Sequence, residues 1–132
     1  MPVSELREKQ KTFLKNIALL IQYAFANGFE LTSGEFYRSQ ETQAAHVAAG
    51  RSKTMNSMHL KRLAADFNIF VNGHLLLADT KQSDIDLSII KKLGDFWVSL
   101  NPANRWGGDW DKDGNPLNQS FRDGGHFQMD DT

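Results

Sequence analysis

Two short segments of this 132-residue chain carry side chains that could bind a metal ion. The first, residues 57–70, holds His59 and, further along, Asp66. The second, near the C-terminal end, holds Asp123 and His126 on either side of two glycines. Two histidines and one carboxylate match the three protein ligands of a catalytic zinc site, whose fourth position stays open. The remaining carboxylate is then a candidate general base.

The spacing of His59 and Asp66 requires the chain to change direction between them. On one continuous helix they would lie roughly 10 Å apart along the axis, at about 1.5 Å per residue. That is too far for ligand bonds of about 2 Å to a single ion. From Asp66 onward polar and apolar residues alternate as on a half-buried strand, and residues 126–129 alternate in the same way. If these strands pair, Asp66 and His126 project from one face and His59 reaches in from the preceding loop.

Asp123 differs from the other candidates because two glycines separate it from His126. Glycine permits tight turns and positive φ, so the carboxylate can fold back beside a metal ion without coordinating it. A carboxylate in that position is what a metal-dependent hydrolase uses as its general base. The residues themselves therefore predict metal-assisted hydrolysis.

The same residues resemble a known family, the zinc peptidases of bacterial cell walls. Its pattern is Ser-x-His-x-x-x-x-Ala-x-Asp, here at 57–66, with an acidic residue three positions before a second histidine. The family includes D-Ala-D-Ala carboxypeptidases and dipeptidases, and phage endolysins that act as L-alanyl-D-glutamate peptidases. The short chain, its Asp-Gly-Gly-His sequence and the Arg-Trp-Gly-Gly-Asp-Trp sequence at 105–110 are most similar to the endolysins. The resemblance covers roughly residues 28–129.

The resemblance implies a role for each of the four residues. His59, Asp66 and His126 are expected to bind one catalytic zinc ion, and Asp123 is expected to be the catalytic base. The implied reaction is hydrolysis of the L-alanyl-D-glutamate bond in the stem peptide of peptidoglycan. Two alternatives stay open: a D-Ala-D-Ala carboxypeptidase or dipeptidase, and a non-catalytic wall-binding module whose zinc holds the fold.

Three further residues belong to the expected site. The family pattern includes an upstream arginine with a glutamine five positions later, and here these are Arg38 and Gln43. Arg38 is expected to bind substrate or to stabilise the developing oxyanion, and Gln43 is expected to contact substrate. Ser57 either orients His59 or binds substrate, and a role in the turn is the alternative.

The chain departs from the family pattern at two positions. Relatives often have glycine where this chain has Arg62, between the first histidine and the aspartate. If the backbone there requires positive φ, Arg62 carries strain. Many relatives have tryptophan directly before the second histidine, where this chain has Gly125. This second departure concerns the shape of the substrate pocket more than the metal site.

Composition bounds the fold and the chemistry. A length of 132 residues predicts a single domain over 1–132, long enough to bury a core. Hydrophobic content of 40% and charged content of 23% are ordinary for a soluble globular protein. There is no cysteine, so a metal site must use histidine and carboxylate ligands and no disulfide can form.

Charge and hydropathy exclude several partners. The net charge of −1 does not suggest nucleic-acid binding. Residues 1–62 are nevertheless basic and residues 63–132 acidic; a basic surface for an anionic polymer and an ordinary spread of solvated charges both stay open. The apolar run at 17–21 is too short to cross a bilayer, so we expect no membrane insertion. We expect a monomer whose partner is bacterial peptidoglycan.

The polar N-terminus shows no signal peptide, which predicts that the protein is first kept in the host cytoplasm. A wall-cutting enzyme with no export signal resembles phage lysis enzymes. This resemblance implies that a membrane-opening phage protein gives it access to the cell wall at lysis.

The predicted fold is α+β, a small, mainly antiparallel sheet with helices packed on one side. Helical periodicity predicts three helices, from Ser4 to Asn27-Gly28, from Ser39 to Gly50 and from about Ser83 to Leu100. The serines are the expected N-caps. Strands are expected at 29–36, from Asp66 to an Asn72-Gly73 hairpin turn, after that turn and at 126–129, and a short strand and turn are expected at 105–110. His46, inside the second helix, is expected to be structural, and His74, beside the hairpin turn, is expected to be exposed and not a metal ligand.

An acidic segment begins within the strand and turn predicted at 105–110. Asp109, Asp111 and Asp113 precede Gly114 and imitate the start of a calcium-binding loop. The twelfth position of such a loop carries a bidentate glutamate, and here it is Ser120. We therefore expect a plain acidic turn, with a weak calcium site as the alternative. The neighbouring tryptophans either line a sugar or peptide cleft or cover the core.

Overall fold

The computed structural model describes residues 2–52, 57–79, 84–119 and 121–131. Within them the fold is α+β, as predicted. The helices are α1 (Val3–Ala26), α2 (Gln40–Ala48) and α3 (Asp84–Leu100), with short 3₁₀ helices η1 (Met58–Lys61) and η2 (Pro116–Asn118). The strands are β1 (Glu30–Ser33), β2 (Ala64–Val71), β3 (His74–Leu75), β4 (Asn104–Trp106) and β5 (His126–Met129).

Strand β2 is the centre of an antiparallel sheet. The strand order is β1-β2-β5-β4, and β3 also pairs with β2. The pairing of β2 with β5 places Asp66 opposite His126, which confirms the predicted register. The predicted hairpin is also present, because Val71 and His74 pair on either side of its turn. Two segments distant in sequence therefore meet at the middle of the sheet.

Strand β1 is shorter than the predicted range, but its chain continues alongside β2. The Gly34 backbone N–H donates to Asp66 O at 2.8 Å, and the Asp66 N–H donates to Glu35 O at 2.8 Å. On the other edge, the Phe67 N–H donates to Gly125 O at 2.8 Å. The backbone around Asp66 is thus hydrogen-bonded on both sides, which positions its side chain firmly.

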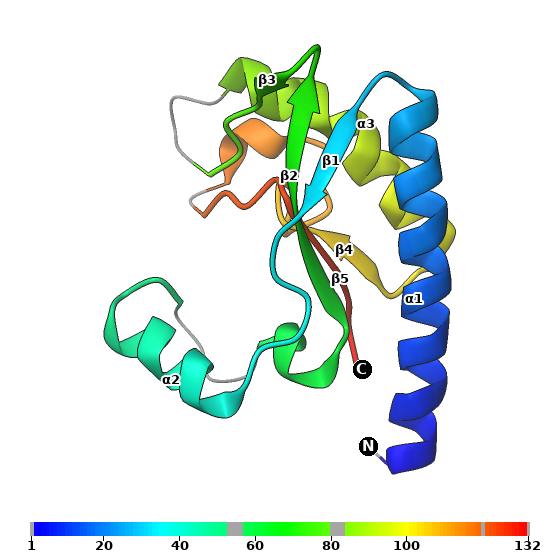
Figure 1. The fold of residues 1–132 in the computed structure, drawn as a ribbon, viewed down its shortest axis with the longest axis vertical. Helices are drawn as coiled ribbons and strands as arrows, with labels where there is room; N and C mark the ends of the chain where they lie inside the picture. The colour runs from blue at the N-terminus through cyan, green and yellow to red at the C-terminus, as the bar shows by residue number, and fades with distance from the viewer. Residues whose placement is uncertain (1, 53–56, 80–83, 120, 132) are drawn as a thin grey trace.

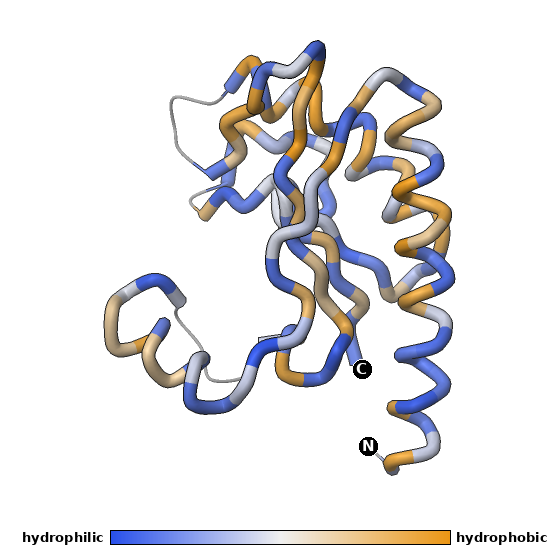
Figure 2. The backbone as a smooth tube through the Cα atoms, viewed as in Figure 1, coloured by the Kyte–Doolittle hydropathy of each residue, from blue (hydrophilic) through white to orange (hydrophobic). Residues whose placement is uncertain are grey.

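Helices α1 and α3 lie side by side against the sheet, whereas α2 lies apart from both (Figure 1). Apolar and polar stretches alternate along α1 (Figure 2), as expected for a helix with one buried face. The predicted one-sided covering of the sheet thus describes α1 and α3, and α2 instead stands beside the functional site. None of the helices in the described ranges combines the length and apolarity needed to cross a membrane.

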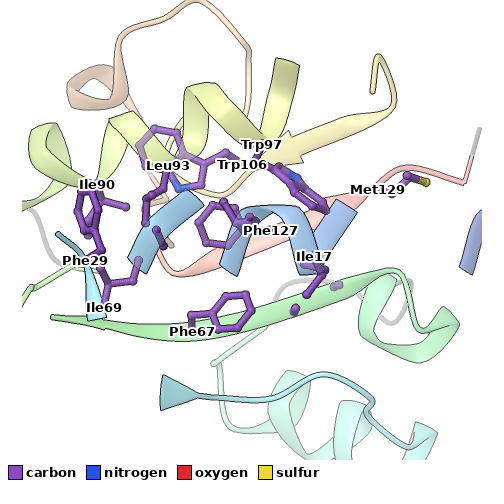
Figure 3. Packing of buried hydrophobic residues seen from close by; sticks show 14 of the residues in the cluster. Ile17, Phe29, Phe67, Ile69, Ile90, Leu93, Trp97, Trp106, Phe127 and Met129 are labelled. Carbon is purple, nitrogen blue, oxygen red and sulfur yellow. The ribbon is translucent and has the colours of Figure 1, made fainter. Parts of the chain in front are cut away.

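Buried aromatic rings join α1 and α3 to the sheet (Figure 3). The ring of Trp97 on α3 lies 5.6 Å from that of Phe13 on α1 and 6.1 Å from that of Phe127 on β5. Phe67 on β2 lies 6.1 Å from Phe127. The Trp97 indole N–H also donates to Gln128 O at 3.0 Å. The phenylalanines enter the core as predicted, and their packing holds β2 and β5 together.

The predicted helix caps have different outcomes. Ser39 caps α2 as predicted, because its side chain accepts a hydrogen bond from the Thr42 N–H. The prediction for Ser4 was wrong, since α1 begins earlier with Pro2 at the cap position and no side-chain cap. Proline has a fixed φ that suits a helix start, and its carbonyl accepts from the Leu6 N–H at 3.1 Å. Ser83 lies outside the described residues.

Arg62 occupies a left-handed turn between η1 and β2, with φ 57° and ψ 36°. The positive φ confirms the strain anticipated from the sequence, since a residue with a Cβ pays roughly 1–2 kcal/mol there. The guanidinium of Arg62 lies 4.1 Å from the centroid of the Tyr37 ring. A cation–π contact of this kind is worth about 0.5–1 kcal/mol at an exposed site. The contact therefore offsets part of the strain in the turn that leads into β2.

We predict that Gly94→Ala destabilises the fold. Gly94 is buried in α3, and a Cβ there would lie 2.2 Å from Cδ2 of Trp106. The indole cannot easily move, because its N–H donates to Gly124 O at 2.8 Å. Overpacking typically costs about 1–3 kcal/mol or more, which should exceed the gain of about 1 kcal/mol in helix propensity. Urea denaturation of the variant would measure the loss.

The matched control for this prediction is Lys92→Ala on the exposed side of the same helix. It should change the free energy of unfolding by no more than about 0.5 kcal/mol. A Gly94→Ala protein as stable as this control would contradict the close packing of α3 on Trp106.

Candidate metal centre and active site

Three potential ligand side chains meet where η1, β2 and β5 come together. Ligand atoms of His59, Asp66 and His126 all lie within 4.8 Å of one another. The two oxygens of Asp66 lie 3.2 Å from His59 Nε2 and 2.8 Å from His126 Nδ1. Ligands arranged tetrahedrally around zinc at about 2.0–2.2 Å stand roughly 3.3 Å apart. The donor types and their spacing therefore fit a zinc ion, and the structure brings together the three ligands that the sequence predicted.

Each histidine is oriented by a hydrogen bond on its other ring nitrogen. His59 Nδ1 lies 2.8 Å from Phe36 O, so Nδ1 carries the proton and Nε2 can act as a ligand. His126 Nε2 lies 2.8 Å from Gln128 Oε1, and the amide orientation is set by donation from Gln128 Nε2 to Asp130 at 2.7 Å. His126 Nδ1 can therefore face a metal ion. Outer hydrogen bonds of this kind commonly orient metal-binding histidines.

The electrostatics of the cluster arise from one partly buried carboxylate. Burial by itself raises the pKa of Asp66, but hydrogen bonds from His126 and His59 outweigh it and hold that pKa well below its usual range. Burial lowers the pKa of His126, but the hydrogen bond with Asp66 and the charge of Asp123 raise it overall. Asp66 is therefore ionised, as a metal ligand must be, and the site favours a positive charge beside it.

Asp123 stands beside the cluster rather than within it. Its Oδ2 lies 3.9 Å from His126 Nδ1, and it does not share the 4.8 Å cluster of ligand atoms found among the described residues. Its tight turn is closed by a hydrogen bond from the His126 N–H to Asp123 O at 3.0 Å. Burial raises the pKa of Asp123 to about 6; the nearby His126 lowers it and Asp66 raises it. A carboxyl group with this pKa can exchange a proton near neutral pH.

Arg38 is held next to the metal ligands by polar contacts on several sides. Its guanidinium forms an ion pair with Glu35, and its Nη1 donates to Gln43 Oε1 at 2.6 Å. Its backbone N–H donates to His59 O at 3.3 Å. Arg38 also lines the cleft, so the guanidinium N–H groups that Glu35 and Gln43 do not engage can reach a bound molecule.

A cleft of about 530 Å³ opens over the ligand cluster. One wall comes from α2 and the chain that follows it, and the other comes from the segment between β4 and β5. These two parts of the chain lie on opposite sides of the site in Figure 1. The cleft is lined by Arg38, His46, Arg51, Ser52, Ser57, Met58, His59, Asp66, Trp110, Gln119, Phe121, Asp123, His126 and Gln128.

Comparison with known proteins decides the family. A family model described as phage L-alanyl-D-glutamate peptidase matches residues 6–129, nearly the whole chain. The chain belongs to this family. It is 31% identical over 110 residues to the L-alanyl-D-glutamate peptidase of Listeria phage A118, an alignment covering 83% of this chain and 34% of the phage protein. The chain thus spans about a third of the length of that relative.

A solved structure supports the fold. The chain is similar to the crystal structure of the Serratia marcescens L-Ala D-Glu endopeptidase ChiX, with a TM-score of 0.60 and 21% identity. The match covers 98% of this chain and 89% of the other. The family resemblance predicted from the motifs is therefore confirmed, and the fold class with it.

Two of the expected substrate-binding residues of this family member have other contacts. Gln43 is fully buried (0% exposed), lies behind Arg38 and donates from Nε2 to Ser52 Oγ at 2.9 Å. The geometry therefore gives Gln43 a supporting position, away from the substrate contact expected from the sequence. Ser57 lines the cleft, and its hydroxyl accepts from the His59 N–H at 3.2 Å. Ser57 is thus placed both to orient η1 and to meet substrate.

The two tryptophans of the family's 105–110 segment have different environments. Trp106 belongs to the core, with 1% of its surface exposed, whereas Trp110 lines the cleft with its ring 5.4 Å from that of His126. At Gly125 a Cβ would lie 2.4 Å from Phe67 O, so no tryptophan fits there on this backbone. Trp110 provides the aromatic surface beside His126 instead.

Two cleft residues carried no sequence signal that pointed to the site. His46 was expected to be structural, but it lines the cleft from α2, and Arg51 does so from the chain just beyond that helix. Neither residue belongs to a recognised motif, and neither stands at a sequence spacing typical of metal ligands. His74 is exposed, at the hairpin, and stays outside the metal cluster.

The acidic segment forms a turn whose carboxylates accept its own hydrogen bonds. The Gly114 N–H donates to Asp109 at 2.8 Å, the Asn115 N–H donates to Asp113 at 2.8 Å, and Gln119 donates to Asp111 at 3.1 Å. Oxygens of the three aspartates also lie within 4.8 Å of one another. The twelfth position, 120, lies outside the described residues, and the statement about calcium stays a prediction.

We predict that Gln43→Ala destabilises the protein because it removes the buried link between Arg38 and Ser52. Loss of a buried hydrogen-bonding partner costs about 1–3 kcal/mol. The control is Gln40→Ala, at an exposed position in the first turn of the same helix, where a change below about 0.5 kcal/mol is expected. Urea denaturation would compare the two variants. Equal stability would show that the network around Arg38 contributes nothing measurable.

Proposed function

We propose that this protein is a zinc-dependent peptidoglycan endopeptidase that hydrolyses the L-alanyl-D-glutamate bond of the stem peptide. The observation that carries the proposal is the cluster of His59, Asp66 and His126 in a cleft, with Asp123 next to it and outside it. Family membership supplies the bond class, and the names of the two relatives agree with it.

Zinc is the metal that best fits the donor set. The cluster offers two imidazoles and one carboxylate, the type of ligand set found in catalytic zinc sites that keep one position open. A bound zinc ion supplies Lewis-acid polarisation of the scissile carbonyl and a water whose pKa falls to about 7. His59, Asp66 and His126 are the residues that would hold it.

Asp123 and Arg38 supply the protein's own chemistry. The Asp123 carboxylate accepts a proton from the attacking water and returns it to the amine of the leaving D-glutamyl residue. Arg38 places guanidinium N–H groups toward the carbonyl oxygen, which becomes negative in the tetrahedral transition state. A preorganised donor of this kind is typically worth about 2.7–4 kcal/mol. The hydrogen bonds and ion pair that hold Arg38 in place support this role.

The geometry supports catalysis over a non-catalytic zinc module. A purely structural zinc site has four protein ligands, and here the described residues place three in the cluster with Asp123 outside it. A cleft above the cluster gives a peptide access.

If the protein acts in phage lysis, the enzyme reaches peptidoglycan after a membrane-opening phage protein has acted.

Zinc binding tests the ligand assignment without reference to activity. The wild-type protein should hold one equivalent of zinc after dialysis against metal-free buffer, as measured by elemental analysis. His59→Ala should lose most of it, because two ligands no longer complete the site. Asp123→Asn is the matched control and should keep a full equivalent. Stoichiometric zinc on His59→Ala, or its loss from Asp123→Asn, would contradict these assignments.

Digestion of purified peptidoglycan tests the reaction. Mass spectrometry should show new N-terminal D-glutamate and alanine left on the muramyl lactyl group, lost with a chelator and restored by zinc. Asp123→Asn should be about 10²–10⁴-fold slower, the usual contribution of a general base. Release of terminal D-alanine alone would assign the protein to the carboxypeptidases. No cleavage by the zinc-loaded protein would favour a binding module.

A further inference from the structure

Arg51 is a cleft residue that the proposed mechanism does not use. It lines the same cleft as the metal ligands, together with His46 and Arg38. We propose that Arg51, with His46 beside it, forms a subsite for the carboxylate that D-glutamate keeps next to the cleaved bond. This inference rests on the proposed function and concerns the selectivity of that same site.

The position of Arg51 is set by the end of α2. The Arg51 and Ser52 backbone N–H groups both donate to His46 O, at 2.8 and 3.2 Å. The Arg51 Nε also approaches His46 Nδ1, at 3.4 Å, which places the guanidinium and the imidazole next to each other. Ser52 in turn accepts the hydrogen bond from Gln43, which binds Arg38. Arg38 is therefore linked through Gln43 to Ser52, the residue that follows Arg51.

Arg51 is exposed at the cleft and lacks the carboxylate partner that several other cations of the described chain have. Arg38 pairs with Glu35, and Lys61, Arg105 and Arg122 also have carboxylate partners. Within the described ranges, Arg51 forms no ion pair with a carboxylate. Of the carboxylates that line the cleft, Asp66 contacts the two histidines and Asp123 lies beside His126. An anionic group on the substrate is the partner that this cation lacks.

The proposed substrate carries such a group. Glutamate has two carboxyl groups, and only one of them can continue the peptide after the L-alanyl-D-glutamate bond. The other remains as a carboxylate or, where it is amidated, as a neutral amide. A guanidinium can bind a carboxylate through two parallel charge-assisted hydrogen bonds. A primary amide is neutral and offers only its carbonyl oxygen as an acceptor, because its NH₂ group donates. Arg51 would therefore favour the carboxylate form over the amide form.

Two synthetic peptides test this selectivity. They share one sequence around an L-alanyl-D-glutamate bond. They differ only in whether the D-glutamate carboxyl group that does not continue the peptide is free or amidated. Wild-type kcat/KM should be higher for the carboxylate peptide. Arg51→Gln should lower kcat/KM for that peptide roughly 10–100-fold, mainly through KM, as expected for loss of a charged hydrogen bond. The same variant should change kcat/KM for the amide peptide by less than about twofold. Arg51→Lys should recover part of the preference for the carboxylate peptide over the amide peptide.

The control variant is Arg7→Gln, which removes one positive charge from an exposed position on α1 and should leave both peptides unaffected. If Arg51→Gln slows both peptides equally, Arg51 only supports the fold of the cleft and the subsite is wrong. If Arg51→Gln slows cleavage of neither peptide, the subsite assignment is also wrong, although the proposed reaction stands. If wild-type protein loaded with zinc cleaves neither peptide, the proposed function fails and the subsite with it.

Discussion

The register between β2 and β5 is the constraint on which the site depends. It places Asp66 opposite His126. Because side chains alternate along a strand, a slip of one residue in either strand would turn the candidate ligand of that strand toward the core. The apolar face of the same strands prevents that slip. Phe67 and Phe127 are buried among the rings of the core, so burying them in any other register would be unfavourable. The packing of one face therefore fixes the ligands on the other.

The two walls of the cleft are held by different interactions. The wall that carries Trp110 follows a strand whose Trp106 is locked under α3. The wall built from α2 has Gln43 as its buried residue and is held through polar contacts with Arg38 and Ser52. Apolar packing thus determines the metal centre, whereas hydrogen bonds determine the basic side of the cleft. Substitutions in α2 can then alter selectivity while the core stays intact.

Buried charge explains why the centre suits a cation. Asp66 stays ionised despite its burial because both histidines donate toward it, and the carboxyl group of Asp123 is close enough for burial and that charge to raise its pKa to about 6. A bound metal ion would likewise balance the negative charge of Asp66. In the proposed function the two carboxylates would have separate tasks, one as a ligand and the other as a proton acceptor.

Sequence patterns by themselves predicted the α+β class, the paired strands and the meeting of His59, Asp66 and His126, because each pattern is local and periodic or belongs to a family motif. Only the tertiary structure decided which tryptophan enters the core, that Gln43 lies behind Arg38, and that Arg51 and His46 line the same cleft as His59, Asp66 and His126. These features depend on how segments far apart in the chain pack together. A single arginine after a helix has no period or spacing from which its neighbours across a cleft can be inferred.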